Sequence, residues 1–196
     1  ACHSRAPRRP RLRLLLTLTM SPSRPRTWVS AWSVGRVLAR LDAGVSRYLN
    51  AEALARGIAV HEWSAAHDEG APYTIEDALR GYAEAWKRFS YTMSPSWTCI
   101  EHVFDTGRYH GIIDRAGIVR GKDAVVDLKT GEGGSSPRTA LQIAAYTQAL
   151  HPARCHDIQR LEVRLSKTGR YRVVTHRDPA DFLTWDRLLR EAEEDR

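Results

Sequence analysis

The sequence has few cysteines and no long hydrophobic run, and both absences exclude classes of protein. It contains three cysteines, at positions 2, 99 and 155, and no two of them form a CxxC pair. Three thiols are too few for a disulfide framework or a four-thiolate cluster, so we expect a reducing compartment and no iron–sulfur cluster. No apolar run approaches the roughly 18 residues that a membrane helix needs. The sequence therefore predicts neither a disulfide-stapled scaffold nor a membrane protein.

The body of the chain also lacks an excess of either charge. The 196 residues carry 30 Lys+Arg and 23 Asp+Glu, a formal net charge of +7. Seven arginines and no acidic residue lie within residues 1–26, which leaves 23 basic and 23 acidic side chains in residues 27–196. We predict a disordered Arg-rich tail over 1–26 and a single domain over 27–196.

The first 19 residues resemble a signal peptide only superficially. Arginines precede the run Leu14, Leu15, Leu16, but this apolar stretch is very short and no A-x-A-like cleavage site follows it. We interpret residues 1–19 as sequence upstream of a start at Met20 that is not native to the protein. A targeting segment and a nucleic-acid-binding arm are the alternatives.

Hydrophobic periodicity predicts a helical N-terminal half followed by strands. Apolar residues recur at helical spacing in the first part of the chain, and short Val-, Ile-, Trp- and Tyr-rich runs bounded by turn residues follow. We expect helices over 28–41, 46–67 and 74–89, three antiparallel strands over 97–104, 108–114 and 124–129, a helix over 137–150, a hairpin of 158–166 and 171–176, and a last helix opening at 178–179. No repeat or interdomain linker interrupts this order.

The most informative motif is the sequence DLKTG over residues 127–131. Asp127 and Lys129 are two apart on a predicted strand, so both project from one face while Leu128 points to the other. A hairpin between residues 115 and 123 brings Asp114, at the end of the preceding strand, close to Asp127. Two converging carboxylates suit a hard divalent cation. A lone DxK is weak evidence by itself, because an exposed strand ion pair has the same pattern.

Such a site is suited to phosphodiester hydrolysis. A bound cation lowers the pKa of a water molecule and neutralises charge on the leaving oxygen. Lys129 would add a fixed positive charge where the pentacovalent phosphate forms.

Together these residues resemble the PD-(D/E)XK nuclease superfamily. The resemblance rests on Asp114, the Asp127-x-Lys129 motif with the following Thr-Gly, and Gln142-x-x-x-Tyr146. The sequence RGIAVH over 56–61 is similar to a helix motif of the RecB-like branch, which includes AddB-type, CRISPR-adaptation and phage exonuclease domains. The resemblance implies an α/β fold with an α-β-β-β-α-β restriction-endonuclease-like core, a mixed central sheet flanked by helices, and an N-terminal helical extension.

The resemblance also implies roles for individual residues. His61, Asp114, Asp127 and the backbone carbonyl of Leu128 would bind Mg²⁺ or Mn²⁺, and Lys129 would be the catalytic lysine. Gln142 and Tyr146 lie four apart on one helix face and would orient the site or the DNA strand, although Tyr146 could equally pack on the sheet. Glu101 matches a carboxylate that many members carry, with a solvated strand residue as its alternative.

The resemblance implies a metal-dependent deoxyribonuclease, acting from a DNA end in recombination, repair or phage DNA processing. No Walker-type G-x-x-x-x-G-K-[ST] occurs, so any helicase would be a partner, as would a recombinase or annealing protein. We expect a cytoplasmic location in a bacterial or phage-infected cell. Ile113 stands where the superfamily's name has Pro, a departure that is common in this branch.

The sequence also allows two other functions. A zinc hydrolase is suggested by His61, Glu62 and His67, but the second histidine falls two residues late for HExxH and off the required helix face. A catalytically silent module that grips DNA within a larger complex is the stronger alternative. Whether the protein is a nuclease or a silent module, we expect Arg138, Arg160 and Arg164 to contact phosphates of the DNA. Further basic candidates for such contacts are Arg80, Lys87, Arg88, Arg170 and Arg172.

Overall fold

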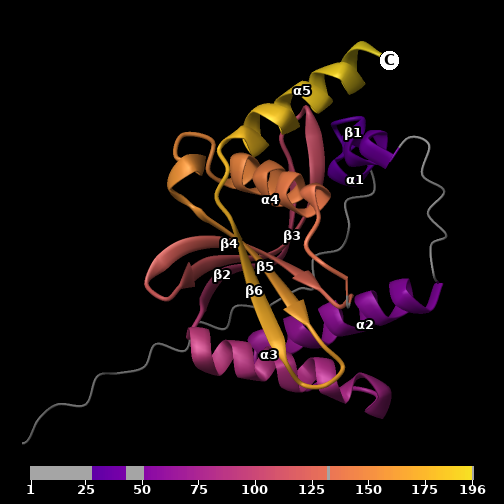
Figure 1. Ribbon diagram of the computed structural model, residues 1–196, viewed down its shortest axis with the longest axis vertical. Coiled ribbons are helices and arrows are strands. Elements are labelled where there is room, and N and C mark those ends of the chain that lie inside the picture. Colours follow the sequence, from indigo (N-terminus) through magenta and orange to yellow (C-terminus); the bar gives the residue numbers. More distant parts are fainter. Residues whose placement is uncertain (1–27, 43–50, 132, 196) are drawn as a thin grey trace, which may run out of the picture.

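The computed structural model describes residues 28–42, 51–131 and 133–195, so the tail predicted over 1–26 lies outside the described residues. A mixed sheet with helices on both faces forms the centre of the molecule (Figure 1). Among the described residues, no helix combines the length and apolar composition that crossing a bilayer requires. The main elements are β1 (Trp32–Ser33), α1 (Val34–Leu38), α2 (Ala51–Asp68), α3 (Arg80–Met93), β2 (Ser96–Asp105), β3 (Tyr109–Val119), β4 (Lys122–Lys129), α4 (Pro137–Leu150), β5 (Gln159–Leu165), β6 (Tyr171–His176) and α5 (Ala180–Glu194).

The sheet has six strands in the described part of the chain. Strands β2, β3 and β4 pair antiparallel in sequence order, as predicted, and β5 and β6 form the predicted hairpin. Strands β4 and β5 are parallel, which requires a crossover, and α4 provides it. The order helix, three antiparallel strands, helix, strand confirms the expected α/β core with its mixed sheet.

Two predicted helix starts are wrong. The helix expected over 28–41 begins as β1, which pairs with β3, and α1 starts only after Ser33, whose hydroxyl accepts a hydrogen bond from the amide of Arg36. The helix expected from residue 74 begins at the 3₁₀ turn Asp77–Leu79. Residues 71–76 are not helical, and Pro72 disfavours helical geometry in the residue before it.

Strand β3 is longer than predicted and carries Asp114 in its interior rather than at its end. It continues to Val119, and the turn to β4 lies at Arg120 and Gly121, both with positive φ. Gly117, expected in the loop, belongs to the strand. A Cβ there would lie 2.1 Å from the carbonyl oxygen of Ser96, so glycine lets β2 and β3 approach closely at this point.

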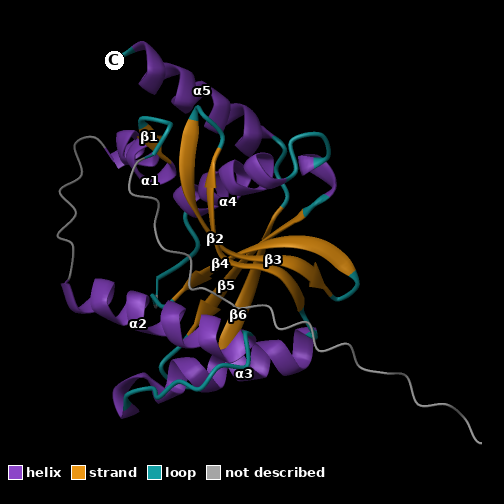
Figure 2. Cartoon of the chain, turned by 180° about the vertical axis from the view of Figure 1, so that it is seen from behind, coloured by secondary structure: helices purple, strands orange, loops and turns teal. Residues whose placement is uncertain are grey.

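Helices cover both faces of the sheet (Figure 2), and a separate hydrophobic core lies on each face. Helices α1, α4 and α5 pack on one face around Trp185, and α2 and α3 pack on the other around Trp86 and Phe89. Gly81 at the start of α3 permits close contact with the β5–β6 hairpin, because a Cβ there would lie 1.8 Å from the carbonyl oxygen of Lys167. This contact ties α3 to the β5–β6 end of the sheet.

Candidate functional site

The site begins where β3 and β4 stop pairing through their backbones. The last pair in the register is Arg115 with Val126. Beyond it, the Asp114 carboxylate takes the place of a backbone acceptor, because the amide of Leu128 donates to its Oδ2 at 2.6 Å. Asp114 is buried and therefore held rigidly against the strand that carries the DLK motif.

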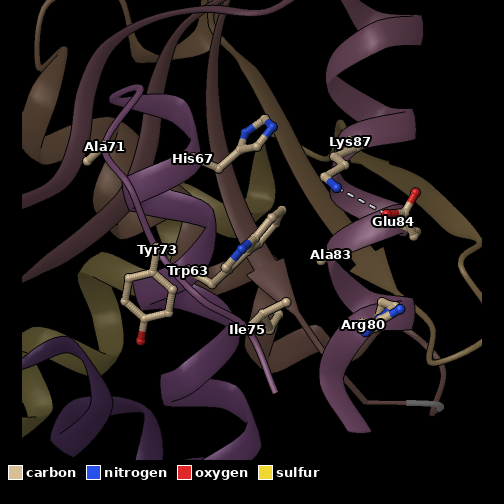
Figure 3. Close-up of a pocket in the computed structure, with 9 residues that line it drawn as sticks. All are labelled: Trp63, His67, Ala71, Tyr73, Ile75, Arg80, Ala83, Glu84 and Lys87. Atoms are coloured by element: carbon tan, nitrogen blue, oxygen red, sulfur yellow. Dashed lines mark hydrogen bonds and ion pairs between the residues drawn. The ribbon is translucent and has the colours of Figure 1, made fainter. Parts of the chain in front are cut away.

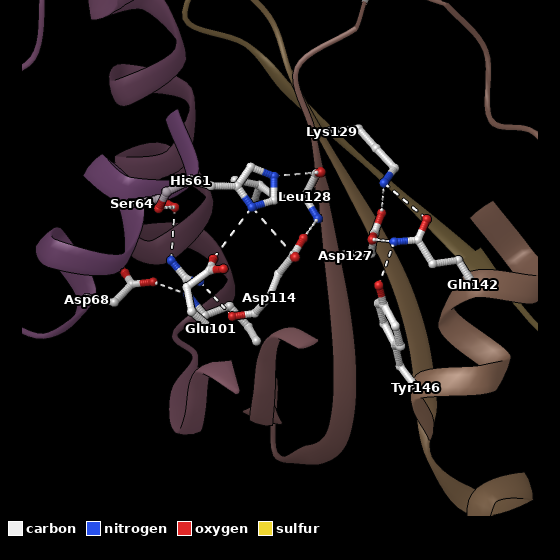
Figure 4. Close-up of polar contacts among 11 residues, drawn as sticks. His61, Ser64, Asp68, Glu101, Asp114, Asp127, Leu128, Lys129, Gln142 and Tyr146 are labelled. Atoms are coloured by element: carbon white, nitrogen blue, oxygen red, sulfur yellow. Dashed lines mark hydrogen bonds and ion pairs between the residues drawn. The ribbon is translucent and has the colours of Figure 1, made fainter. Parts of the chain in front are cut away.

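His61, Glu101 and Asp114 converge next to this point (Figure 4). His61 comes from α2, and its Nδ1 lies 3.5 Å from Glu101 Oε1 and 3.6 Å from Asp114 Oδ1. Its Nε2 donates to the carbonyl oxygen of Leu128 at 3.2 Å. One ligand atom from each of the three side chains lies within 4.8 Å of the others, so they could hold a metal ion.

Glu101 adopts a backbone conformation that is uncommon for a residue with a side chain. It lies in the middle of β2 with φ 46°, in the left-handed region. Its carboxylate accepts a hydrogen bond from Arg115 Nη1 at 3.1 Å and faces His61. Such strain is often retained at functional sites. The sequence left Glu101 open between a site residue and a solvated carboxylate, and the structure places it in the cluster.

The electrostatics of the cluster favour positive charge at its centre. Burial is the largest single influence and lowers the pKa of His61, but the charges of Asp114, Glu101 and Asp127 together outweigh it and raise this pKa to about 9. Burial raises the pKa of Glu101, and His61 and Arg115 lower it by more, so the net direction is down. The surrounding carboxylates thus stabilise a positive charge at this position, and the protonated imidazole of His61 provides one.

Asp127 and Lys129 form a second group beside the first. The Lys129 Nζ lies 2.7 Å from Asp127 Oδ2, and the Gln142 amide nitrogen donates to Asp127 Oδ1 at 2.9 Å and to the Tyr146 hydroxyl at 3.0 Å. Lys129 Nζ is also 3.5 Å from Gln142 Oε1. Leu128 points to the other face, into the core beneath α2 and α3, as the strand alternation predicted.

Burial also controls the protonation of this second group. Burial raises the pKa of Asp127 to about 6 despite the opposing effect of Lys129. Burial lowers the pKa of Lys129, but Asp127 and Asp114 raise it by more, so Lys129 stays charged at neutral pH. Tyr146 keeps its proton, since burial and then the charge of Asp127 raise its pKa.

A buried arginine that no sequence motif predicted supports the cluster. Arg115 is fully buried, donates to Asp68 Oδ2 at 2.7 Å and to the hydroxyl of Ser64 at 2.9 Å, and stacks over Trp86. The available signals were an arginine directly after Asp114 within an apolar strand, and Ser64 and Asp68 three and seven residues after His61 on one helix face.

A buried glutamate that the sequence did not predict lies beside Asp127. Glu162 on β5 is the register partner of Asp127 and is fully buried. It accepts hydrogen bonds from Ser135 and Arg164, and His176 Nε2 lies 3.1 Å away. Arg164 also donates to the carbonyl oxygen of Gly131 at 2.8 Å, so this network anchors the loop that follows Lys129.

The predicted phosphate contact of Arg160 is wrong. This side chain is 3% exposed, pairs with Asp181 at 2.6 Å and stacks over Phe182, so it joins β5 to α5 and presents no free guanidinium. Arg164 is largely buried and engaged by Glu162, whereas Arg138 is half-buried and donates to the carbonyl oxygen of Gly35 at 3.2 Å. Any contact of these two with DNA stays a prediction.

The histidines of the zinc alternative lie apart. His67 packs against Trp63 in a cavity of about 480 Å³ between α2 and α3, together with Tyr73 and Lys87 (Figure 3). His61 faces the sheet instead (Figure 4). Among the described residues, the three-residue group that could hold a metal contains His61 and not His67. Trp63 and Tyr109 are aromatic residues of the kind that can stack on bases, but both are 5% exposed and belong to the cores.

The fold and site define an α/β protein with a histidine–carboxylate cluster and an adjacent buried Asp–Lys pair on a mixed sheet. The family model of the PD-(D/E)XK nuclease superfamily matches residues 33–195. The chain therefore belongs to the PD-(D/E)XK nuclease superfamily. No curated protein matches the chain in a sequence search.

The donors present fit the divalent cation that this superfamily implies. They comprise one imidazole nitrogen, two carboxylates and the carbonyl oxygen of Leu128, and oxygen-rich sets of this kind suit Mg²⁺ or Mn²⁺. The structure brings Glu101 into this group, while the carboxylate of Asp127 is engaged by Lys129 and Gln142.

Proposed function

We propose that the protein is a divalent-metal-dependent deoxyribonuclease that hydrolyses DNA phosphodiester bonds. One observation carries this proposal: the Lys129 ammonium is fixed between Asp127 and Gln142, directly beside the group of His61, Glu101 and Asp114. An isolated surface ion pair would have neither the buried Asp127 nor a neighbouring cation-binding group.

In this proposal His61, Glu101, Asp114 and the carbonyl of Leu128 hold Mg²⁺ or Mn²⁺, and Asp127 completes the acidic side of the site. A bound cation of this kind lowers the pKa of a water molecule and neutralises charge on phosphate oxygens. Lys129 stabilises negative charge on the phosphate in the transition state, because its own charge is held in place before reaction.

Gln142 and Tyr146 act as positioning residues. Gln142 bridges Asp127 and the Tyr146 hydroxyl and thus fixes the carboxylate that pairs with Lys129. Tyr146 packs edge-on against Phe104, which holds its ring while its hydroxyl faces the site. This packing and the contact with Gln142 support both interpretations of Tyr146, packing on the sheet and orienting the site.

We also propose that the protein belongs to the RecB-like branch of the superfamily. The RGIAVH motif supports the RecB-like branch, because its His61 lies in the cluster. We propose that the enzyme acts from DNA ends, in recombination, repair or phage DNA processing, in the cytoplasm and together with a helicase or a recombinase or annealing protein. We propose that residues 27–196 form a single domain.

The test is cleavage of end-labelled linear and closed-circular DNA by the purified protein with Mg²⁺ or Mn²⁺, and with EDTA. We expect metal-dependent cleavage that Asp127→Ala and Lys129→Ala each reduce by at least about 100-fold. Asp123→Ala and Lys122→Ala are matched controls on the same strand, because both residues lie at its far end. Both controls should cleave like the wild type.

Each outcome decides between the candidate functions. Cleavage of linear DNA with closed circles left intact supports an exonuclease, and cleavage of circles supports an endonuclease. Retained DNA binding without cleavage in either metal would refute the nuclease proposal and favour the silent DNA-binding module.

A further inference from the structure

A cavity of about 520 Å³ opens between the loop after Lys129 and the β5–β6 hairpin. Its lining includes three arginines and three glycines, namely Gly131, Gly133, Gly134, Arg164, Arg170 and Arg172. Among the described residues that line it, none is acidic. A hollow with this composition favours an anion, since guanidinium groups bind phosphate with paired hydrogen bonds.

The arginines continue a line of positive charge that starts at Lys129. Lys129 is the register partner of Arg164 on β5, which is the partner of Arg172 on β6. Their neighbours Leu128, Val163 and Val173 all pack into the core under α2 and α3, so the three cations share the opposite face. Adjacent strands lie about 4.8 Å apart, so the line spans about 10 Å.

This length matches a nucleic acid strand. Successive nucleotides in duplex DNA rise about 3.4 Å along each strand, so about 10 Å corresponds to roughly three nucleotides. A strand whose phosphate lies at Lys129 would thus place a neighbouring phosphate within reach of the cavity. Figure 1 shows β4, β5 and β6 side by side, with the β5–β6 hairpin extending past the sheet beside α3.

The charges of two arginines are available for such a ligand. Arg170 and Arg172 are exposed, and within the described part of the chain neither side chain makes an ion pair or a hydrogen bond. Arg164 and Arg172 face each other across β5 and β6, and directly opposed like charges destabilise a strand pair unless an anion compensates. Of these two arginines, Arg164 pairs with Glu162 and also donates to the carbonyl oxygen of Gly131, whereas Arg172 has no such carboxylate partner in the described part of the chain.

We propose that Arg164, Arg170 and Arg172, with Gly131, Gly133 and Gly134, form a phosphate-binding subsite for the DNA strand held at Lys129. Arg164 shapes the cavity, and Arg170 and Arg172 supply the net charge. The subsite rests on the proposed function, because it takes a phosphate of the same substrate. That phosphate is either an internal backbone phosphate or a terminal 5′-phosphate.

The test is binding of a single-stranded 20-nucleotide DNA, labelled with fluorescein at its 3′ end, by fluorescence anisotropy in EDTA between 50 and 200 mM salt. The variant is Arg170→Ala/Arg172→Ala, and the matched control is Arg187→Ala/Arg190→Ala, which removes the same charge from exposed positions on α5. Each phosphate that the protein neutralises contributes about 0.7 to the slope of log K against log salt for single strands, so loss of the one phosphate bound here should lower the slope by about 0.7. Over this salt range the variant would lose about 2.6-fold less affinity than the wild type.

Two further measurements identify the phosphate and exclude the possibility that the alanine variant merely misfolds. An Arg170→Lys/Arg172→Lys variant keeps the charge and should restore most of the slope. DNA with a 5′-phosphate and DNA with a 5′-hydroxyl distinguish the two sources: a preference for the 5′-phosphate that the alanine variant loses identifies a terminal phosphate, and equal affinities identify a backbone phosphate.

The inference is overturned if the alanine variant keeps the wild-type slope and affinity, or if the lysine variant behaves like the alanine variant. The proposed function fails by a different readout, the absence of metal-dependent cleavage by the wild type. A protein that binds DNA through this subsite without cleaving it would refute the nuclease and leave the subsite standing.

Discussion

Replacing Arg115 by Met should destabilise the protein strongly. Arg115 is fully buried and is the ion-pair partner of Asp68 at 2.7 Å and of Glu101 at 3.1 Å. The Asp68 side chain is only 4% exposed, so the substitution leaves a buried carboxylate without its cation. Removal of one partner from a buried ion pair costs about 3–5 kcal/mol.

Urea and thermal unfolding measure this effect. For a domain of this size, 1 kcal/mol changes Tm by about 2–4 °C, so we expect Arg115→Met to lower Tm by about 6–20 °C. Arg187→Met is the control, because Arg187 is exposed and, among the described residues, forms an ion pair with Glu191 on the same helix. That substitution should change the free energy of unfolding by less than about 0.5 kcal/mol.

A double-mutant cycle assigns the loss to the ion pair. Asp68→Asn removes the charge but keeps an oxygen acceptor for the indole N–H of Trp86, which donates to Asp68 at 2.9 Å. The double variant Asp68→Asn/Arg115→Met should therefore be more stable than the sum of the two single changes predicts, by about 0.5–3 kcal/mol. Additive effects, or a loss below about 1 kcal/mol for Arg115→Met alone, would refute the reasoning.

Three further predictions concern the site, the packing and the acid stability. Asp127→Asn should reduce metal-dependent DNA cleavage by at least about 100-fold when assayed below the Tm of the variant, and cleavage within tenfold of the wild type would exclude its role. Gly81→Ala should destabilise the protein by about 1–3 kcal/mol in urea unfolding, because its Cβ meets the Lys167 carbonyl oxygen, while Gly35→Ala, with open space around it, should not destabilise by overpacking. Burial raises the pKa of Glu162, but His176, Ser135 and Arg164 lower it to about 2, below its ordinary value of 4.5. The ionised Glu162 therefore stabilises the fold above pH 4.5, and this stabilisation, about 3 kcal/mol, is lost as the pH falls towards 2. Glu162→Gln should remove this contribution from the pH dependence of the free energy of unfolding. An unchanged acid profile would contradict this.

Short-range patterns in the sequence were sufficient for part of the site. Residues two apart on a strand share a face, and residues four apart on a helix share a face, so the pairs Asp127 and Lys129, and Gln142 and Tyr146, could be predicted before the strand and helix were placed. Both pairs are in contact in the structure. The order of helices and strands was predictable for the same reason, since each depends on a local hydrophobic period.

Element ends and long-range contacts were not predictable in this way. The position of Asp114 inside β3 depends on how far β2 and β4 pair beyond it, and the conformation of Glu101 depends on neighbours on both sides of its strand. Arg160 and Arg164 are similar in sequence context, yet one is buried against α5 and the other lines a cavity, because packing partners differ.

The sequence by itself determined the superfamily, the strand that carries Asp127 and Lys129, and the helix that carries Gln142, because these follow from motifs and periodicities of a few residues. Only the tertiary structure decided that Glu101 lies beside His61 and Asp114. It also decided that the buried Arg115 pairs with Asp68, and that Arg172 lies in register with Arg164 and so extends the row of cations that starts at Lys129. The physical reason is that these contacts join residues far apart in the chain, and their geometry is set by sheet register and by helix packing rather than by any local preference.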